Sequence, residues 1–112
     1  MTAITDDFMR ERIAQTRSYT VVILHGTDKL KQPDAMKIVW EHGRRNFQLR
    51  ADGALPIVCP ISDGSDVTGV GILNASLEEA HKIMEGDPAV QAGLFTFELH
   101  ACRSFPGDAL PR

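Results

Sequence analysis

The side chains of this sequence best suited to chemistry are its four histidines and two cysteines: His25, His42, His81, His100, Cys59 and Cys102. An imidazole ordinarily titrates near neutral pH, so a histidine can take up and release a proton during a reaction. His42 lies in a segment with helical periodicity, whereas His25 and His100 lie in apolar segments typical of strands. A single helical histidine is ordinarily structural or solvated, and His81 is expected at the surface. Acid/base chemistry at His42 is therefore weighed against a structural role.

Metal and cofactor chemistry finds less support in the sequence. Glu98 and His100 alternate on one face of the last predicted strand, and His25 can join them from the first strand. Three such groups can hold a metal ion, but we favour hydrogen-bonded polar groups near one end of the sheet. The sequence lacks a phosphate-binding loop, a dinucleotide-binding glycine motif, and the HExxH and GxSxG motifs. We expect neither a metal nor a cofactor.

The predicted elements follow the order strand, helix, strand, strand, helix, strand, over residues 18–26, 33–51, 54–61, 67–74, 76–86 and 94–102. This order predicts the α+β class and a ferredoxin-like βαββαβ fold with an antiparallel sheet. Right-handed crossovers place the first and third strands at the centre, and Pro56 and Pro60 favour an edge for the second. The domain spans 18–102, between an N-terminal arm (1–17) and a C-terminal tail (103–112). The arm is either a short helix capped by Thr5 and docked on the domain or a frayed terminus.

This topology also predicts free thiols. Cys59 and Cys102 fall on the two opposite edges, about 14 Å apart at three strand spacings. A disulfide needs Cα atoms within about 7 Å of one another. We expect both thiols to be buried and unpaired.

Composition narrows the function classes. The chain has 112 residues, of which 43% are hydrophobic and 24% charged, with a formal net charge of −3. Such a balance is ordinary for one globular domain and argues against a nucleic-acid clamp. No apolar run approaches the roughly 20 residues that cross a bilayer, and no secretion signal is evident. We expect a soluble, cytoplasmic domain without nucleic-acid or membrane partners.

The strands are apolar on both faces, although the two helices can cover only one. An uncovered apolar face of several hundred Å² is unusual for a monomer. We expect a homodimer, or a higher oligomer built from it, that stacks two sheets and encloses a small-molecule ligand. The first helix carries two apolar stripes, Met36/Trp40/Gly43/Phe47 and Ile38/His42/Arg45/Leu49. We expect the first stripe to form the central packing contact and His42 to lie beside it.

Several short motifs occur in an order that resembles the YciI-like (YCII-related) family. They are His42 in the first helix, Gly53 after it, Cys59-Pro60 closing the second strand, and the segment Asp87-Pro88-Ala89-Val90-Gln91-Ala92-Gly93 before the last strand. The resemblance spans about residues 18–102. It departs at Cys59, where the family usually has glycine, and at Ala89, where an aromatic residue commonly follows Asp-Pro.

The resemblance implies a dimeric α+β barrel whose cleft contains a His/Asp pair. By position the histidine is His42, and the aspartate is Asp87 as first choice or Asp63 as second. Asp87 also precedes a proline, which makes it a suitable N-cap for the short turn that follows. Around this pair we expect a substrate site lined by Arg45, Cys59, Asp63, His25 and His100, with Arg45 available to bind a carboxylate.

The resulting hypothesis is a cofactor-free acid/base enzyme, of lyase or isomerase type, acting on a small aromatic or lactone-like molecule through the His/Asp pair. An alternative is a non-catalytic ligand-binding or accessory module that uses the same dimer cleft. A third, less favoured hypothesis is a cofactor-free oxygenase of the related dimeric barrels.

Overall fold

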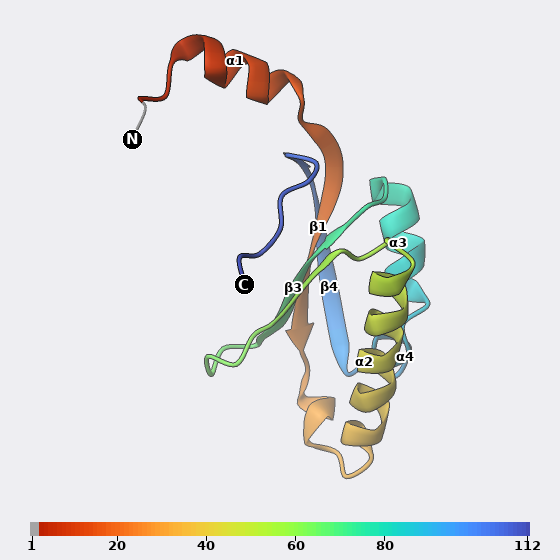
Figure 1. Ribbon diagram of the computed structural model, residues 1–112. Coiled ribbons are helices and arrows are strands. Elements are labelled where there is room, and N and C mark those ends of the chain that lie inside the picture. The colour runs from red at the N-terminus through yellow and green to blue at the C-terminus, as the bar shows by residue number, and fades with distance from the viewer. Residues whose placement is uncertain (1–2) are drawn as a thin grey trace.

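The computed structural model describes residues 3–112, and its helices and strands follow the predicted order (Figure 1). The elements are α1 (Asp6–Ala14), β1 (Arg17–Gly26), the 3₁₀ helix η1 (Asp28–Lys31), α2 (Ala35–Ala51), β2 (Ile57–Pro60), β3 (Val67–Leu73), α3 (Leu77–Glu85), α4 (Pro88–Gln91) and β4 (Phe95–Ser104). The predicted α+β class and ferredoxin-like βαββαβ order are confirmed.

The four strands form one sheet in the order β2-β3-β1-β4, and every neighbouring pair is antiparallel. β1 and β3 are central, as predicted. β2 is an edge strand that ends at Pro60. Proline has no backbone N–H, but at an edge this removes no hydrogen bond from the interior of the sheet. Cys59 on β2 and Cys102 on β4 are both free and half-buried, rather than fully buried as expected.

Helices cover one face of the sheet, which we call the helix face. Figure 1 shows α2, α3 and α4 on one side of the strands and the C-terminal tail on the other. The core between sheet and helices contains Val22, Leu24, Leu55, Leu73, Ala80, Met84, Leu94 and Phe95, all buried. The opposite face, which we call the open face, carries Tyr19, Val21, Ile23, Ile57, Val70 and Ile72, all only partly buried.

The expectation for the first helix was wrong in two respects. α2 begins at Ala35 rather than Pro33, because η1 and a turn occupy the segment before it. Its packing face is also reversed, since Met36, Trp40 and Phe47 are about 70% exposed while His42 is buried. The side of α2 that holds Ala35, Ile38 and Leu49 packs on the core instead. The small side chain of Ala35 allows α2 to pack closely against the core, and His42 has a polar hydrogen-bond partner on the same side of the helix.

α1 is a short helix that extends away from the sheet (Figure 1). The Thr5 side chain accepts a hydrogen bond from the Phe8 amide, so the predicted N-cap is present. No residue of α1 is buried, and Phe8, Met9 and Ile13 are exposed. Within residues 3–112, no helix combines the length and apolar character needed to cross a membrane.

The close contact between β2 and β3 gives a stability prediction. A Cβ at Gly71 would lie 2.9 Å from Leu55 Cδ1 and 3.2 Å from the Ile57 carbonyl oxygen. Gly71→Ala should therefore lower the free energy of unfolding by about 1–3 kcal/mol through overpacking. Gly69→Ala is the control on the same strand, because its Cβ would meet nothing closer than 3.6 Å. Urea denaturation checks both, and equal losses in the two variants would contradict the packing argument.

Candidate active site

His42 and Asp87 form a buried hydrogen-bonded pair. His42 lies in the middle of α2, and its Nδ1 is 2.7 Å from Oδ1 of Asp87, which is 45 residues further along the chain. The Asp87 side chain is 1% exposed and that of His42 is 11% exposed. Phe95 packs edge-on against the imidazole, with the ring centroids 4.9 Å apart. The fold therefore brings together the histidine and the first-choice aspartate of the sequence analysis.

Asp87 is held in place by the helix that it caps. Its Oδ2 accepts hydrogen bonds from the backbone N–H groups of Ala89, at 3.0 Å, and Val90, at 3.1 Å. Pro88 occupies the first helical turn, where its missing N–H costs nothing. Because the two carboxylate oxygens have different partners, capping of α4 and pairing with His42 coexist in one side chain.

The environment of Asp87 favours its ionised form. Burial acts to raise the pKa of this carboxyl group, but its partners outweigh burial. The hydrogen bond and charge of His42, with the backbone N–H groups of Val90 and Ala89, place the pKa below its ordinary value of 3.8. An ionised carboxylate can only accept hydrogen bonds, so His42 must donate from Nδ1. In the neutral imidazole this leaves the lone pair on Nε2.

Asn46 is a member of this site that the sequence analysis missed. Its Nδ2 lies 3.2 Å from Nε2 of His42, in the geometry of an amide N–H donating to the imidazole lone pair. Asn46 follows His42 by four residues, a spacing that places both side chains on one face of a helix. This four-residue spacing is the feature of the sequence from which the contact between His42 and Asn46 could have been predicted.

Arg45 supplies a positive charge near the pair. Its Nη1 is 3.9 Å from Oδ1 of Asp87, and its side chain is 28% exposed. A Cβ at Gly86 would lie only 2.9 Å from Arg45 Nη2, so glycine leaves room for the guanidinium there. Of the residues expected to line the substrate site, Arg45 is the one that the structure places beside His42 and Asp87.

The expected site residues Cys59, His25, His100 and Asp63 do not lie with His42. Side chains alternate across a strand, so Val58 packs into the core and Cys59 falls on the open face. His25 and His100 share the open face by the same alternation, on the side of the sheet away from His42. Asp63 is exposed in the turn between β2 and β3, where it accepts hydrogen bonds from Ser65. These four residues cannot form one cleft with His42 within a single chain.

Polar groups form a separate network at one end of the open face. His25 lies between two carboxylates, with Nδ1 3.2 Å from Asp66 Oδ2 and Nε2 2.6 Å from Glu98 Oε1. The other oxygen of Glu98 is 2.7 Å from Nε2 of His100. This is the hydrogen-bonded arrangement favoured from the sequence. No group of three or more potential ligands positioned to hold a metal ion occurs in residues 3–112.

The network changes the titration of its members. The pKa of His25 is raised above its ordinary value of 6.5, mostly by the hydrogen bond with Glu98. Desolvation acts to lower this pKa, and Asp66 acts to raise it further. Hydrogen bonds from His100 and His25 lower the pKa of Glu98. The network therefore favours a positive charge on His25 and a negative charge on Glu98.

Two substitutions at Asp87 separate its roles. Asp87→Asn keeps a capping oxygen but turns an amide N–H toward Nδ1 of His42, and should cost about 1–3 kcal/mol of unfolding free energy. Asp87→Ala removes the cap and leaves the imidazole N–H without its acceptor, so its cost should be larger, about 3–5 kcal/mol. Urea denaturation at neutral pH measures both.

The same substitutions carry a pH dependence whose sign follows from the lowered pKa of Asp87. The stabilising effect of the ionised Asp87 carboxylate is present above pH 3.8, the ordinary pKa of the group. It is lost as the pH falls through the lower pKa that the group has in the folded protein. The stability difference between the parent protein and Asp87→Asn should therefore shrink in acid. A difference that stays constant from neutral pH to about pH 2 would contradict the ionised pair.

The open-face network predicts a raised titration midpoint for His25. Imidazole NMR signals should place the titration midpoint of His25 above pH 6.5. Glu98→Gln should lower this midpoint because the strongest hydrogen-bond acceptor of His25 is lost. Glu85→Gln, which removes the partner of the exposed His81, is the matched control and should leave it unchanged. The stabilisation from charged His25 is present below about pH 6.5 and is lost as the pH rises through the raised midpoint. An unchanged His25 midpoint in Glu98→Gln would refute the assignment.

No protein-family model matches the chain, and no curated protein matches it. One similar solved structure is 5-chloro-2-hydroxyhydroquinone dehydrochlorinase from Burkholderia phenoliruptrix, in complex with 2,5-dihydroxybenzoquinone. The sequences are 19% identical, the match covers 73% of this chain and 90% of the other, and the TM-score is 0.49. At this level the likeness transfers neither family membership nor function to this chain.

Proposed function

We propose that this protein is a small acid/base enzyme of YciI-like type that needs no cofactor and uses His42 as its base. The proposed reaction is of lyase or isomerase type, on a small aromatic or lactone-like molecule. One observation carries the proposal. The imidazole of His42 is oriented through Nδ1 by a buried, ionised carboxylate at 2.7 Å, which leaves Nε2 as the basic atom.

The proposed chemistry is a proton transfer at Nε2. The imidazole takes a proton from a carbon or hydroxyl of the substrate, and Asp87 stabilises the imidazolium that forms. In an isomerisation the imidazolium delivers a proton to another carbon of the substrate, after its N–H has exchanged with solvent. In an elimination the electron pair of the broken bond expels a leaving group, and the imidazolium keeps the proton until solvent removes it. Asn46 must move aside for substrate, because its amide occupies Nε2 in the free protein.

Arg45 is proposed as the substrate-binding cation. Its guanidinium is partly exposed and lies next to the carboxylate that orients His42. Its guanidinium could bind a carboxylate, phenolate or enolate oxygen of the substrate. Guanidinium groups bind such anions through paired hydrogen bonds, and they stabilise negative charge that develops when a proton leaves carbon.

We further propose that the open face is covered by a second copy of the chain. Six partly buried apolar or aromatic side chains lie on this face, and the C-terminal tail covers only part of it. Tyr19, Ile57 and Ile72 line a shallow pocket together with residues 104–110 of that tail. Stacking two sheets through the remaining area would bury the apolar surface that one chain leaves open.

A second candidate is a non-catalytic ligand-binding or accessory module. The observation that favours it is the engagement of both imidazole nitrogens, one by Asp87 and one by Asn46, in a side chain that is only 11% exposed. In this role the pair would fasten α2 to the start of α4. Such a module would bind a small molecule without converting it.

Turnover of defined substrates distinguishes the two candidates. Suitable probes are α-angelica lactone, whose ring double bond moves after proton abstraction, and a chlorinated hydroxyhydroquinone, which can eliminate chloride. In D₂O, the enzyme should incorporate deuterium into the lactone product, as followed by NMR. His42→Gln should lower kcat by about 10²–10⁴-fold, the usual contribution of a general base.

His81→Gln is the matched control, because His81 is exposed on α3 and paired with Glu85. It should retain the activity of the parent protein, and thermal denaturation should show that both variants are folded. Retained turnover in a folded His42→Gln variant would exclude the proposed base. Saturable probe binding by the parent protein without any product would favour the accessory module.

A further inference from the structure

The guanidinium of Arg45 lies between the middle of α2 and the end of α3. Arg45 follows His42 by three residues, a spacing that makes the two side chains neighbours on the surface of a helix. Its Nη1 is 3.9 Å from Oδ1 of Asp87. A Cβ built on Gly86, which caps the C-terminus of α3, would lie 2.9 Å from Nη2 and 3.6 Å from Cζ of Arg45. The guanidinium therefore occupies the space in which a side chain at position 86 would begin.

The backbone gives no reason for a glycine at position 86. Gly86 has φ −80° and ψ −6°, right-handed values that other residues adopt freely. Gly53, just after α2, differs, because its φ of +80° favours glycine. The Ile83 carbonyl oxygen would lie 3.5 Å from a Cβ on Gly86, which is an ordinary contact. Arg45 is therefore the neighbour that a larger residue at position 86 would displace.

The guanidinium of Arg45 keeps its hydrogen-bond donors available to a ligand. Its side chain is 28% exposed, and within residues 3–112 it makes the ion pair with Asp87 but no hydrogen bond. The neighbouring Arg44 differs, since its Nε donates to Glu41 at 3.1 Å. The five N–H groups of a guanidinium form a planar fork that matches a carboxylate. Because the Asp87 side chain is only 1% exposed, Arg45 is the charged group of this pair that a ligand can reach.

We propose that Gly86 is a positioning residue for substrate binding. The absence of a side chain at Gly86 lets the Arg45 guanidinium lie beside Asp87, where it binds the anionic group of a small aromatic substrate. This inference rests on the proposed role of Arg45 as the substrate-binding cation and adds its consequence for specificity. With the guanidinium held there, the site selects an aromatic carboxylate or phenolate over a neutral molecule of the same shape.

The substitution Gly86→Ala moves the guanidinium while the fold stays intact. A Cβ essentially never lies as close as 2.9 Å to another heavy atom, so Nη2 of Arg45 has to shift. The atom that shifts is the far end of a flexible side chain, and alanine loses less backbone freedom on folding than glycine does. The effect of Gly86→Ala should therefore appear in ligand binding and not in stability. If Arg45 serves only as a cation at the C-terminal end of α3, ligand binding should not respond.

The experiment titrates the protein with benzoate as the anionic probe and with benzamide as its neutral counterpart. Binding is followed by the ¹H–¹⁵N NMR signals of Arg45 Nε and of the Asp87 amide. Benzoate should shift both signals saturably and bind at least about tenfold more tightly than benzamide, because a charged acceptor strengthens the hydrogen bonds from the guanidinium. Gly86→Ala should weaken benzoate binding about tenfold, and should leave benzamide binding unchanged. Its urea midpoint of unfolding should be that of the parent or higher.

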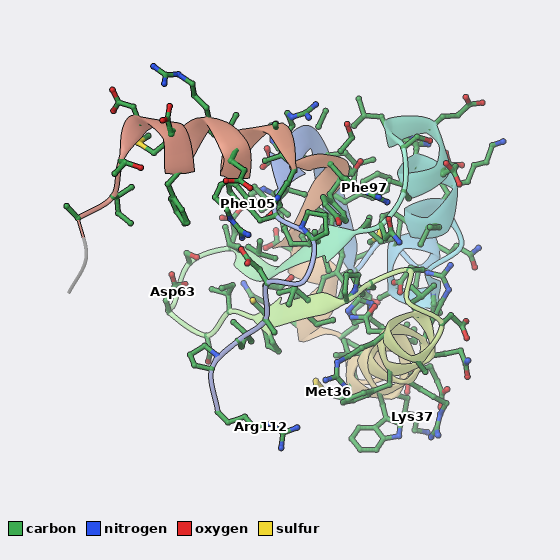
Figure 2. The ribbon with its side chains drawn as sticks, turned by 45° about the horizontal axis from the view of Figure 1, so that its top comes forward. Met36, Lys37, Asp63, Phe97, Phe105 and Arg112 are labelled. Carbon is green, nitrogen blue, oxygen red and sulfur yellow. The ribbon has the colours of Figure 1, made fainter. Side chains whose placement is uncertain are left out.

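Gly43→Ala is the matched control. It makes the same substitution at another helical glycine without a positive φ, and a Cβ at Gly43 would meet nothing within 4 Å. Gly43 lies seven residues after Met36, two turns along the same side of α2. Figure 2 shows Met36 and Lys37 projecting from α2 away from the sheet. This variant should bind benzoate as the parent does.

Arg45→Gln tests whether Gly86 acts through Arg45. Arg45→Gln alone should remove the preference for benzoate, and adding Gly86→Ala should weaken binding no further. The proposal is overturned if the parent does not bind benzoate, if Gly86→Ala binds it as tightly as the parent, or if Gly86→Ala weakens binding equally with and without Arg45. The proposed base fails separately, because benzoate binding should survive in His42→Gln whether or not that variant retains turnover.

Discussion

The hydrogen bond between His42 and Asp87 is the interaction on which the helical layer depends. It joins the middle of α2 to the start of α4, on the side of α2 that packs against the core. Asp87 can be buried because each of its oxygens has a partner, from the imidazole or from the N-terminal amides of α4. The charge that this arrangement keeps on Asp87 also determines which nitrogen of His42 is free to act as a base.

Much of the fold follows from local rules. Prolines at 56 and 60 indicated an edge strand, which the structure confirms, and Ser76 and Glu79 form a capping box at the start of α3. Asp87-Pro88 indicated a helix start for an equally local reason. The association of Asp87 with His42 came from a resemblance, because nothing in the sequence shows which of two aspartates lies near a residue 45 or 21 positions away.

The surfaces were harder to predict. α2 has two apolar stripes, and periodicity alone does not show which of them faces the core. We expected the bulkier stripe to face the core. Instead, the side of α2 that faces the core carries Ala35, whose small side chain allows close packing, and His42, which has a buried hydrogen-bond acceptor. The expected grouping of Cys59, His25 and His100 with His42 failed for a related reason. Alternation along each strand places these three side chains on one face of the sheet. Only the three-dimensional structure shows that α2 covers the opposite face.

The central claim is that Asp87 holds His42 in the tautomer with a proton on Nδ1 and the lone pair on Nε2. Imidazole ¹⁵N chemical shifts, recorded on the parent protein and on Asp87→Asn at a pH where the ring is neutral, measure this directly. We expect a protonated Nδ1 and an unprotonated Nε2 in the parent, with the opposite tautomer favoured in Asp87→Asn. A parent protein whose His42 carries its proton on Nε2 would contradict it.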